Sequence, residues 1–157
     1  MRIITAADDD YAVATEPFQP TTRPTLLPWA QWSTLRTHWP RDARVGIVLP
    51  NTVDVTLLRA DLPRWSVVAL EFPKWTDGRA YSQARLLRAR LGYGGEIRAH
   101  GEVLVDMLPL LQRSGFDAAC LRDGQSAEAA RRAFGFFPGH YQGDVLELLP
   151  LFARRAA

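Results

Sequence analysis

Short apolar runs alternate with longer amphipathic segments along most of the chain. The apolar runs predict four strands, at residues 45–49, 66–72, 96–100 and 116–121. The amphipathic segments predict four helices, at residues 53–62, 78–91, 103–113 and 126–134. Because each predicted helix follows a predicted strand, the pattern favours an α/β fold in which parallel strands are joined by right-handed crossovers.

Residues with strong local preferences mark several of the helix ends. Ser126 is a candidate N-cap for the fourth helix, and Asp77 is one for the second. Gly115 follows the third helix and is expected to end it. Ala80, Ala84 and Leu87 recur at helical spacing and are expected to form the core face of the second helix.

The two ends of the chain show a weaker pattern. Residues 1–24 are interpreted as an appendage, in which residues 2–5 and 11–15 could pair as a short hairpin before a proline-rich stretch. Residues 26–39 have the spacing of an amphipathic helix. Residues 136–157 have little periodicity and predict an irregular tail. The whole chain, residues 1–157, is expected to form a single domain.

The third predicted strand distinguishes two architectures. Glu96, Arg98 and His100 share one of its faces, and Glu71 is the matching polar position on the second strand. A sheet with one polar face is typical of a barrel interior or a subunit interface, which favours half of a β/α barrel. The alternative is an open, doubly wound sheet with the third strand at an edge, where charged side chains are common.

Composition and charge narrow the function classes. The apolar fraction of 47% and the charged fraction of 23% are those of an ordinary globular domain, and the net charge of +2 gives no support for nucleic-acid binding. Cys120 is the only cysteine, so the chain alone cannot form a disulfide or a thiolate zinc site. No membrane span, metal site or cofactor is predicted, and the single cysteine favours the cytoplasm.

Polar residues follow the predicted strands, at the edge of the sheet where α/β proteins bind ligands. Cations at this edge, together with the free N–H groups of helix N-termini, favour a small oxyanion or a phosphate. The candidate anion- or partner-binding residues are Lys74, Thr76, Asp77, Gly78, Arg79, Arg98 and Arg122. Glu71 and His100 are candidates for an acid–base pair, but a structural ion pair is the favoured interpretation of these two residues.

The longest distinctive stretch is residues 70–88, LEFPKWTDGRAYSQARLLR. It resembles the characteristic motif of a bacterial domain of unknown function, DUF934. Shorter pieces resemble the same family, namely LPN at 49–51, GEIRA at 95–99, RSGFDA at 113–118, YQ at 141–142 and LPLF at 149–152. The resemblance implies a gene encoded beside that of an assimilatory sulfite or nitrite reductase haemoprotein, and this reductase is then the expected partner. It supplies no catalytic residues.

Three functions are therefore considered for this chain. The first is an accessory protein of sulfite reduction that binds an oxyanion or a reductase through the basic rim. The second is an enzyme that acts on a small anionic or phosphorylated substrate, with Glu71 or His100 as general base. The third is a structural subunit of a homo-oligomer. A redox enzyme has little support, because the chain has no dinucleotide-binding motif and a single cysteine.

Overall fold

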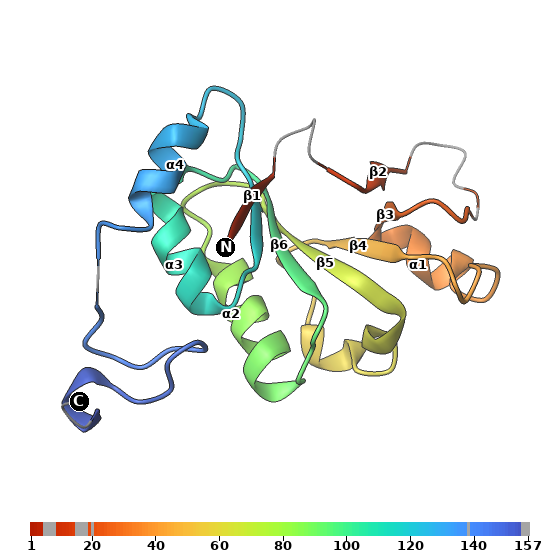
Figure 1. Ribbon diagram of the computed structural model, residues 1–157. Coiled ribbons are helices and arrows are strands. Elements are labelled where there is room, and N and C mark those ends of the chain that lie inside the picture. Colours follow the sequence, from red (N-terminus) through yellow and green to blue (C-terminus); the bar gives the residue numbers. More distant parts are fainter. Residues whose placement is uncertain (5–8, 15–18, 20, 138, 155–157) are drawn as a thin grey trace.

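A single parallel sheet organises the molecule (Figure 1). The structure is a computed structural model that describes residues 1–4, 9–14, 19, 21–137 and 139–154. Within this part of the chain, seven strands lie side by side in the order β1-β7-β6-β5-β4-β3-β2, and all neighbouring pairs are parallel. The predicted α/β class with a parallel sheet is confirmed.

The strands are short at the edges of the sheet and longest in the middle. Their bounds are Arg2–Ile4 (β1), Ala12–Val13 (β2), Thr25–Pro28 (β3), Val45–Leu49 (β4), Trp65–Phe72 (β5), Glu96–Gly101 (β6) and Ala118–Cys120 (β7). The helices are Trp29–Leu35 (α1), Arg79–Arg85 (α2), Leu108–Ser114 (α3) and Ala127–Ala133 (α4). A π-helical turn, Leu86–Arg90, continues α2, and 3₁₀ turns cover Val55–Leu58, Leu62–Arg64, Val105–Met107 and Leu151–Ala153.

The strand order decides between the two predicted architectures. From β2 to β7, each strand lies beside the next one in the chain, so every crossover moves across the sheet in the same direction. A doubly wound sheet reverses this direction at a switch point, and the reversal places helices on both faces. Winding in one direction curls the sheet into a half-barrel, which confirms the favoured architecture.

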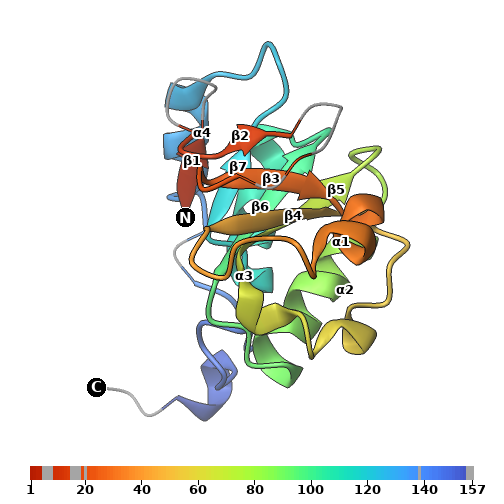
Figure 2. The same cartoon turned by 90° about the vertical axis from the view of Figure 1, so that its right-hand side faces the viewer.

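One face of the sheet, the convex face, carries the helices. Figure 2 shows α2 and α3 on one side of the strands. Ile47, Leu70 and Phe72 on this face are fully buried, and they belong to the same apolar cluster as Ala84 and Leu87 of α2 and its π-helical turn. The predicted core face of the second helix is therefore confirmed. Its burial against a sheet that is apolar on this side is the main source of stability for the layer.

The opposite, concave face has different neighbours. A separate, smaller apolar cluster contains Val67 and Ala69 of β5 together with Leu26 and Tyr11, and no helix residue belongs to it. β6 lies between β5 and β7, so its polar residues are not on an edge strand. The edge interpretation of Arg98 is therefore wrong, and the polar positions of β6 line the interior of a half-barrel.

The amino-terminal region differs most from expectation. The predicted hairpin of residues 2–5 and 11–15 is wrong, because β1 pairs with β7 and β2 pairs with β3, both in parallel. Residues 5 and 15 lie outside the described residues. The reason is that β1 and β2 each extend a free edge of the sheet, where unpaired N–H and C=O groups are available.

The segment predicted as a helix over residues 26–39 begins as a strand. Leu26 and Leu27 lie on opposite faces of β3, and both are buried. Their spacing therefore reflects a strand that is buried on both faces, and the prediction of a helix here is wrong. Pro28 has an extended backbone and occupies the N-cap position of α1, which then runs only to Leu35. A strand and a short helix therefore occupy the stretch in which the sequence pattern predicts a single helix.

The helix predicted for residues 53–62 is replaced by two 3₁₀ turns. Asp54 accepts hydrogen bonds at one carboxylate oxygen from both the backbone N–H and the hydroxyl of Thr56, at 2.9 and 2.7 Å. An aspartate that bonds the backbone locally in this way competes with α-helical hydrogen bonding. The other predicted helices are present, with bounds that differ by a few residues from those expected.

The predicted helix ends are largely confirmed. Ser126 caps α4 by accepting the N–H of Ala129 at 3.2 Å. Gly115 ends α3 with φ of +101°, a left-handed conformation that favours glycine. At α2 the N-cap position is Gly78 rather than Asp77, although Asp77 accepts the backbone N–H of Arg79 at 3.3 Å.

Candidate functional site

The carboxyl ends of β6 and β7 border a half-open hollow of about 490 Å³. We call it the carboxyl-end hollow and define it by its lining residues, which are His100, Gly101, Glu102, Cys120, Leu121, Arg122 and Asp123. In barrels and in open α/β sheets, loops at this end of the strands form the ligand sites. The hollow is therefore the candidate functional site.

Gly101 shapes the floor of the hollow. Its φ of +95° lies in the left-handed region, and a Cβ atom on this residue would lie 2.5 Å from the carbonyl oxygen of Phe72. The N–H of Glu102 donates to that same carbonyl at 2.8 Å. A glycine is therefore required where β6 turns away from β5, and this turn directs Glu102 toward Arg122 of the neighbouring loop.

Two of the predicted site residues meet in the hollow. Arg122 donates to Glu102 at 2.8 Å, and both side chains are close to half exposed. His100 is partly buried and has no hydrogen-bond or ion-pair partner among the described residues. An exposed ion pair of this kind contributes little free energy, so the Arg122 guanidinium is available to an incoming anion at small cost.

Glu71 and His100 are neighbours across the sheet. The β5–β6 register places Glu71 directly opposite His100 at the carboxyl end of the concave face. Both side chains are partly exposed. The structure thus brings the two predicted acid–base candidates into adjacent positions beside the hollow, without a hydrogen bond between them.

The loop after β5 forms a separate group of polar residues. Arg79 donates to both carboxylate oxygens of Asp77, at 3.0 and 2.6 Å, and this pair lies outside the carboxyl-end hollow. Its hydrogen bonds with Arg79 hold the pKa of Asp77 well below the usual range of a carboxyl group. Lys74 and Thr76 are exposed, and Gly78 has φ of −82°, which any residue adopts. The predicted rim is therefore divided, because these residues lie outside the hollow that Arg122 lines.

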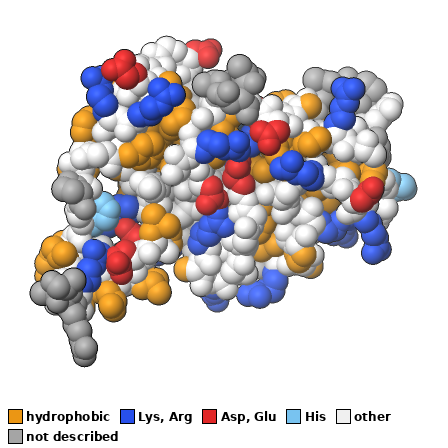
Figure 3. All heavy atoms as spheres, in the orientation of Figure 1, with side chains coloured by type: hydrophobic (Ala, Val, Ile, Leu, Met, Phe, Trp, Pro, Cys, Tyr) orange, Lys and Arg blue, Asp and Glu red, His pale blue; other side chains and the backbone are white. Residues whose placement is uncertain are grey.

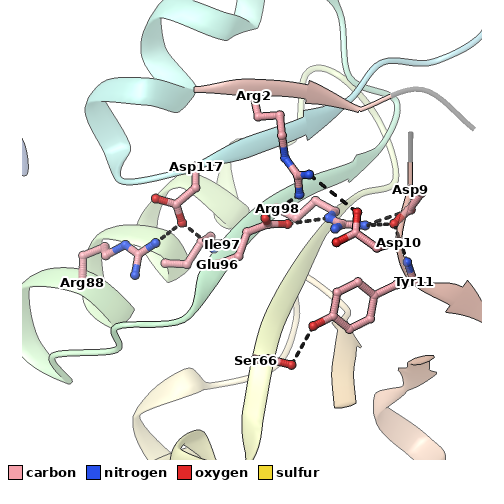
Figure 4. A network of polar contacts seen from close by, with 10 residues as sticks. All are labelled: Arg2, Asp9, Asp10, Tyr11, Ser66, Arg88, Glu96, Ile97, Arg98 and Asp117. Carbon is pink, nitrogen blue, oxygen red and sulfur yellow. Dashed lines mark hydrogen bonds and ion pairs between the residues drawn. The ribbon is translucent and has the colours of Figure 1, made fainter. Parts of the chain in front are cut away.

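Arg98 lies deeper on the concave face than the predicted rim. Its side chain is 0% exposed, and it donates to both carboxylate oxygens of Asp9 at 2.8 Å and to Glu96 at 2.8 Å (Figure 4). Arg2 of β1 also donates to Glu96 at 2.8 Å. The structure therefore places Arg98 in a buried ionic network, away from the carboxyl-end hollow.

The residues that cover Arg98 come from the amino-terminal segment, where the sequence showed no functional pattern. Tyr11 of this segment is buried, and the Arg98 guanidinium lies 5.5 Å from the centre of its ring. Its hydroxyl is hydrogen bonded to Ser66 at 2.7 Å. The acidic run that contains Asp9 was the one available signal. The distance of 89 positions between Asp9 and Arg98 hides the pairing from any local analysis.

A second arginine, Arg88, connects the amino ends of β6 and β7. Arg88, on the π-helical turn, donates to the carbonyl oxygens of Gly95 and Gly115 and is ion-paired with Asp117 (Figure 4). Asp117 also accepts the N–H of Ile97 at 2.7 Å. These contacts lie at the opposite end of the strands from the hollow, so they position β6 and β7 and form no part of the candidate site.

Two further features of the described residues bear on function. Among them, no group of three or more His, Cys, Asp or Glu side chains is arranged to hold a metal ion. No described helix combines the length and the apolar character that crossing a membrane requires.

Comparison with known proteins adds a family. No curated protein matches the chain. The family model described as bacterial protein of unknown function, DUF934, matches residues 46–152, roughly two thirds of the chain. The match contains the residues of the carboxyl-end hollow and begins after β3, so Asp9 and Tyr11 lie outside it. The chain therefore belongs to the DUF934 family of bacterial proteins, whose function is unknown.

Proposed function

We propose that the protein is a cytoplasmic accessory component of sulfite reduction that binds a small oxyanion in the carboxyl-end hollow. The observation that supports this proposal is that His100 and Arg122 line one half-open hollow at the carboxyl ends of adjacent strands. The connection with sulfite reduction comes from the family resemblance, which implies a place beside a sulfite or nitrite reductase.

The chemistry of the two residues suits an oxyanion. A guanidinium presents several N–H donors in one plane, and these match the oxygens of sulfite, sulfate or phosphate. The His100 ring supplies a further donor and has no partner among the described residues that would need to be displaced. Glu102 would give up Arg122 to the anion and turn toward solvent, since both are already about half exposed.

The acidic neighbours set the expected affinity. Glu102 and Asp123 also line the hollow, and Glu71 lies beside it, so three carboxylates oppose the attraction of the Arg122 guanidinium for an anion. We therefore expect weak binding, with a Kd on the order of 1 mM, that decreases as the salt concentration rises. Affinity of this order fits a protein that exchanges its ligand readily with a partner.

The test is a titration of the purified chain with sulfite, followed by NMR of the backbone amide signals. Arg122→Gln and His100→Ala are each expected to weaken binding about tenfold, which corresponds to about 1.4 kcal/mol. Lys74→Ala is the matched control, because Lys74 is an exposed cation outside the hollow and its loss should leave the affinity unchanged. An unperturbed spectrum at tens of millimolar sulfite would remove the proposal.

The reductase itself is the proposed macromolecular partner. Co-purification of the chain with a sulfite reductase haemoprotein from the same cell, sensitive to salt, is the expected result. If the chain binds sulfite but never the reductase, the accessory role is lost while the oxyanion site remains.

A second candidate function rests on the adjacent positions of Glu71 and His100. A carboxylate and an imidazole on neighbouring strands beside a hollow could remove and return a proton on a bound anionic substrate. Under this hypothesis, Glu71→Gln abolishes turnover of the substrate and leaves the oxyanion affinity of the hollow intact. A variant with unchanged turnover would exclude Glu71 from the mechanism.

A further inference from the structure

The segment that follows α4 exposes an unusual amount of apolar surface. We call residues 136–137 and 139–154 the C-terminal arm. Twelve large apolar residues are exposed in the described part of the chain, and eight of them lie on the arm. These eight are Phe136, Phe137, Tyr141, Leu146, Leu148, Leu149, Leu151 and Phe152. Figure 3 shows the resulting concentration of hydrophobic side chains over the arm, at the lower left of the molecule.

The arm has a defined conformation, so this exposure is built into the fold. Asp144 accepts hydrogen bonds from the backbone N–H groups of Leu146 and Glu147 at 2.9 Å, and the N–H of Leu151 donates to the carbonyl oxygen of Tyr141 at 2.9 Å. The rings of Tyr141 and Phe152 lie 5.5 Å apart. An arm that is folded back on itself in this way loses little conformational freedom when it binds.

Contacts with Arg113 of α3, among them one ion pair, hold the arm to the body of the protein. Arg113 of α3 donates to Asp144 at 3.0 Å, and the Asp144 side chain is largely buried. Burial opposes ionisation of Asp144, but the bonds from Glu147 and Arg113 outweigh it and lower the pKa of the carboxyl group. The arm therefore stays attached to α3 at neutral pH, with its apolar side chains turned outward.

The amount of apolar surface is that of a protein interface. If a whole aromatic side chain offers about 200 Å² and a leucine slightly less, the eight side chains leave on the order of 900 Å² accessible. The largest apolar patch of a monomeric protein is about 300–600 Å², whereas one partner in a standard stable interface contributes about 800 Å². The arm therefore has the area that one member of a stable dimer needs.

The charges of the arm are compatible with an identical partner. Asp144 is paired with Arg113, and Glu147 lies 4.0 Å from Arg154. With its acidic groups paired internally, the arm has little net charge to select a strongly acidic or basic partner. Two copies of the same face can therefore approach each other without like-charge repulsion.

A receptive cavity lies beside the arm. A half-open hollow of about 550 Å³ separates α3 from the arm, and we call it the α3 hollow. The apolar residues of its lining include Pro109, Leu110, Phe137 and Tyr141, and its polar residues are Asp106, Arg113, His140 and Gln142. Because Phe137 and Tyr141 of the arm also line the hollow, exposed apolar side chains lie beside a cavity that side chains of a second copy could enter, as a two-fold symmetric interface requires.

We propose that two copies of this chain associate through the C-terminal arm, with apolar side chains of each arm filling the α3 hollow of the other copy. The family match extends to residue 152 and so includes almost the whole arm. This inference is independent of oxyanion binding, because the carboxyl-end hollow shares no lining residue with the α3 hollow.

Sedimentation of the full-length chain over about 1–100 µM tests the proposal. The unaltered chain is expected to be a dimer with a Kd in the micromolar range or below, as for standard interfaces of this size. Leu148→Asp, on the arm, and Leu110→Asp, at the α3 hollow, are each expected to raise the dimer Kd by at least about tenfold. Circular dichroism should show that both variants remain folded, since neither residue is buried.

Leu57→Asp is the matched control. Leu57 is 79% exposed and Leu148 is 81% exposed, but Leu57 lies on the first 3₁₀ turn, outside the arm. Its replacement should leave the dimer intact. A chain that is monomeric at 100 µM overturns the proposal and leaves a different protein as the occupant of the arm. Dissociation caused equally by Leu57→Asp also overturns it. Sulfite binding by Leu148→Asp reports separately on the carboxyl-end hollow.

Discussion

Arg98 and His100 lie two positions apart on β6, on the same face of the sheet, and yet their surroundings are opposite. Arg98 is fully buried between two carboxylates and beside the ring of Tyr11. His100 is partly exposed in the carboxyl-end hollow and has no partner among the described residues. The amino-terminal segment covers the first position and leaves the second open.

The difference teaches how a half-barrel divides a polar face. A complete barrel would cover the interior with its remaining strands. Here a segment that carries Asp9 and Tyr11 covers the concave face near Arg98. The polar residues near the middle of the strands thus become structural, and only those at the carboxyl ends stay accessible to a ligand.

The largest expected effect is the loss of the buried cation. Arg98→Met would leave the carboxylate of Asp9 without its partner in a mostly buried position, and we expect a loss of about 3–5 kcal/mol in the free energy of unfolding, measured in urea. Arg2→Met is the matched control, because Arg2 contacts the same Glu96 but is half exposed, so its loss should be below about 1 kcal/mol. Equal losses in the two variants would break the comparison.

A substitution at Gly101 tests the boundary between the covered part of the concave face, near Arg98, and the accessible part, at the carboxyl-end hollow. Gly101→Ala forces a side chain into a left-handed conformation and against the carbonyl of Phe72. We expect it to destabilise the fold by about 1–3 kcal/mol and to weaken oxyanion binding as well. A variant that keeps both properties would show that the turn after β6 does not shape the hollow.

The contribution of the covering segment itself is smaller. Tyr11→Phe removes the hydroxyl that is hydrogen bonded to Ser66 but keeps the ring against Arg98. We expect a loss of about 1 kcal/mol in thermal or urea unfolding, with no change in sulfite affinity. A change in sulfite affinity would mean that the two halves of the concave face are coupled.

The accessible half should tolerate substitution. His100→Ala is expected to change the free energy of unfolding by less than about 0.5 kcal/mol while weakening ligand binding. The measurement pairs urea unfolding with the sulfite titration on the same preparation. A large loss of stability in this variant would assign His100 a structural role like that of Arg98.

The smallest effect concerns Cys120, which lines the carboxyl-end hollow and whose pKa also depends on Arg98 in the covered part of the concave face. Burial raises the pKa of its thiol, Arg98 opposes the rise, and the carboxylates of Asp9 and Glu96 add to it. The folded chain therefore holds this proton more tightly, and its alkylation at pH 8 should be slower than in urea. Because the folded pKa is the higher one, the associated stability is present below the ordinary value of about 9 and is lost as the pH rises through the folded pKa. Alkylation as fast as in the unfolded chain would contradict this.

Between β4 and α4 the fold could be predicted from sequence because its signals are local, except that two 3₁₀ turns stand where a helix was expected at residues 53–62. A window of a few residues is enough to identify the apolar runs of β4 and β5 and the cap at Ser126. The amino-terminal strands could not be predicted, because β2 has two residues, β1 has three, and β1 pairs with a strand more than a hundred positions away. Strands this short show no measurable periodicity.

The candidate site was predictable only in outline. The polar alternation of β6 identified the face that Arg98 and His100 share, and the strand ends identified His100 and Arg122. Which residues remain free depends on remote partners, as the contact between Asp9 and Arg98 illustrates. Arg79 differs in that its partner, Asp77, is only two positions away, so that pairing had a local signal.

The position of β1 beside β7 has a consequence for biosynthesis. From β3 to β7 the sheet can assemble in the order in which the ribosome releases its strands, since each new strand docks on the previous one. β1 has no neighbour until residues 118–120 emerge, and Asp9 has no partner until Arg98 emerges. The nascent chain therefore holds β1 unpaired until β7 is made, and closure of the concave face follows assembly of the strands between them.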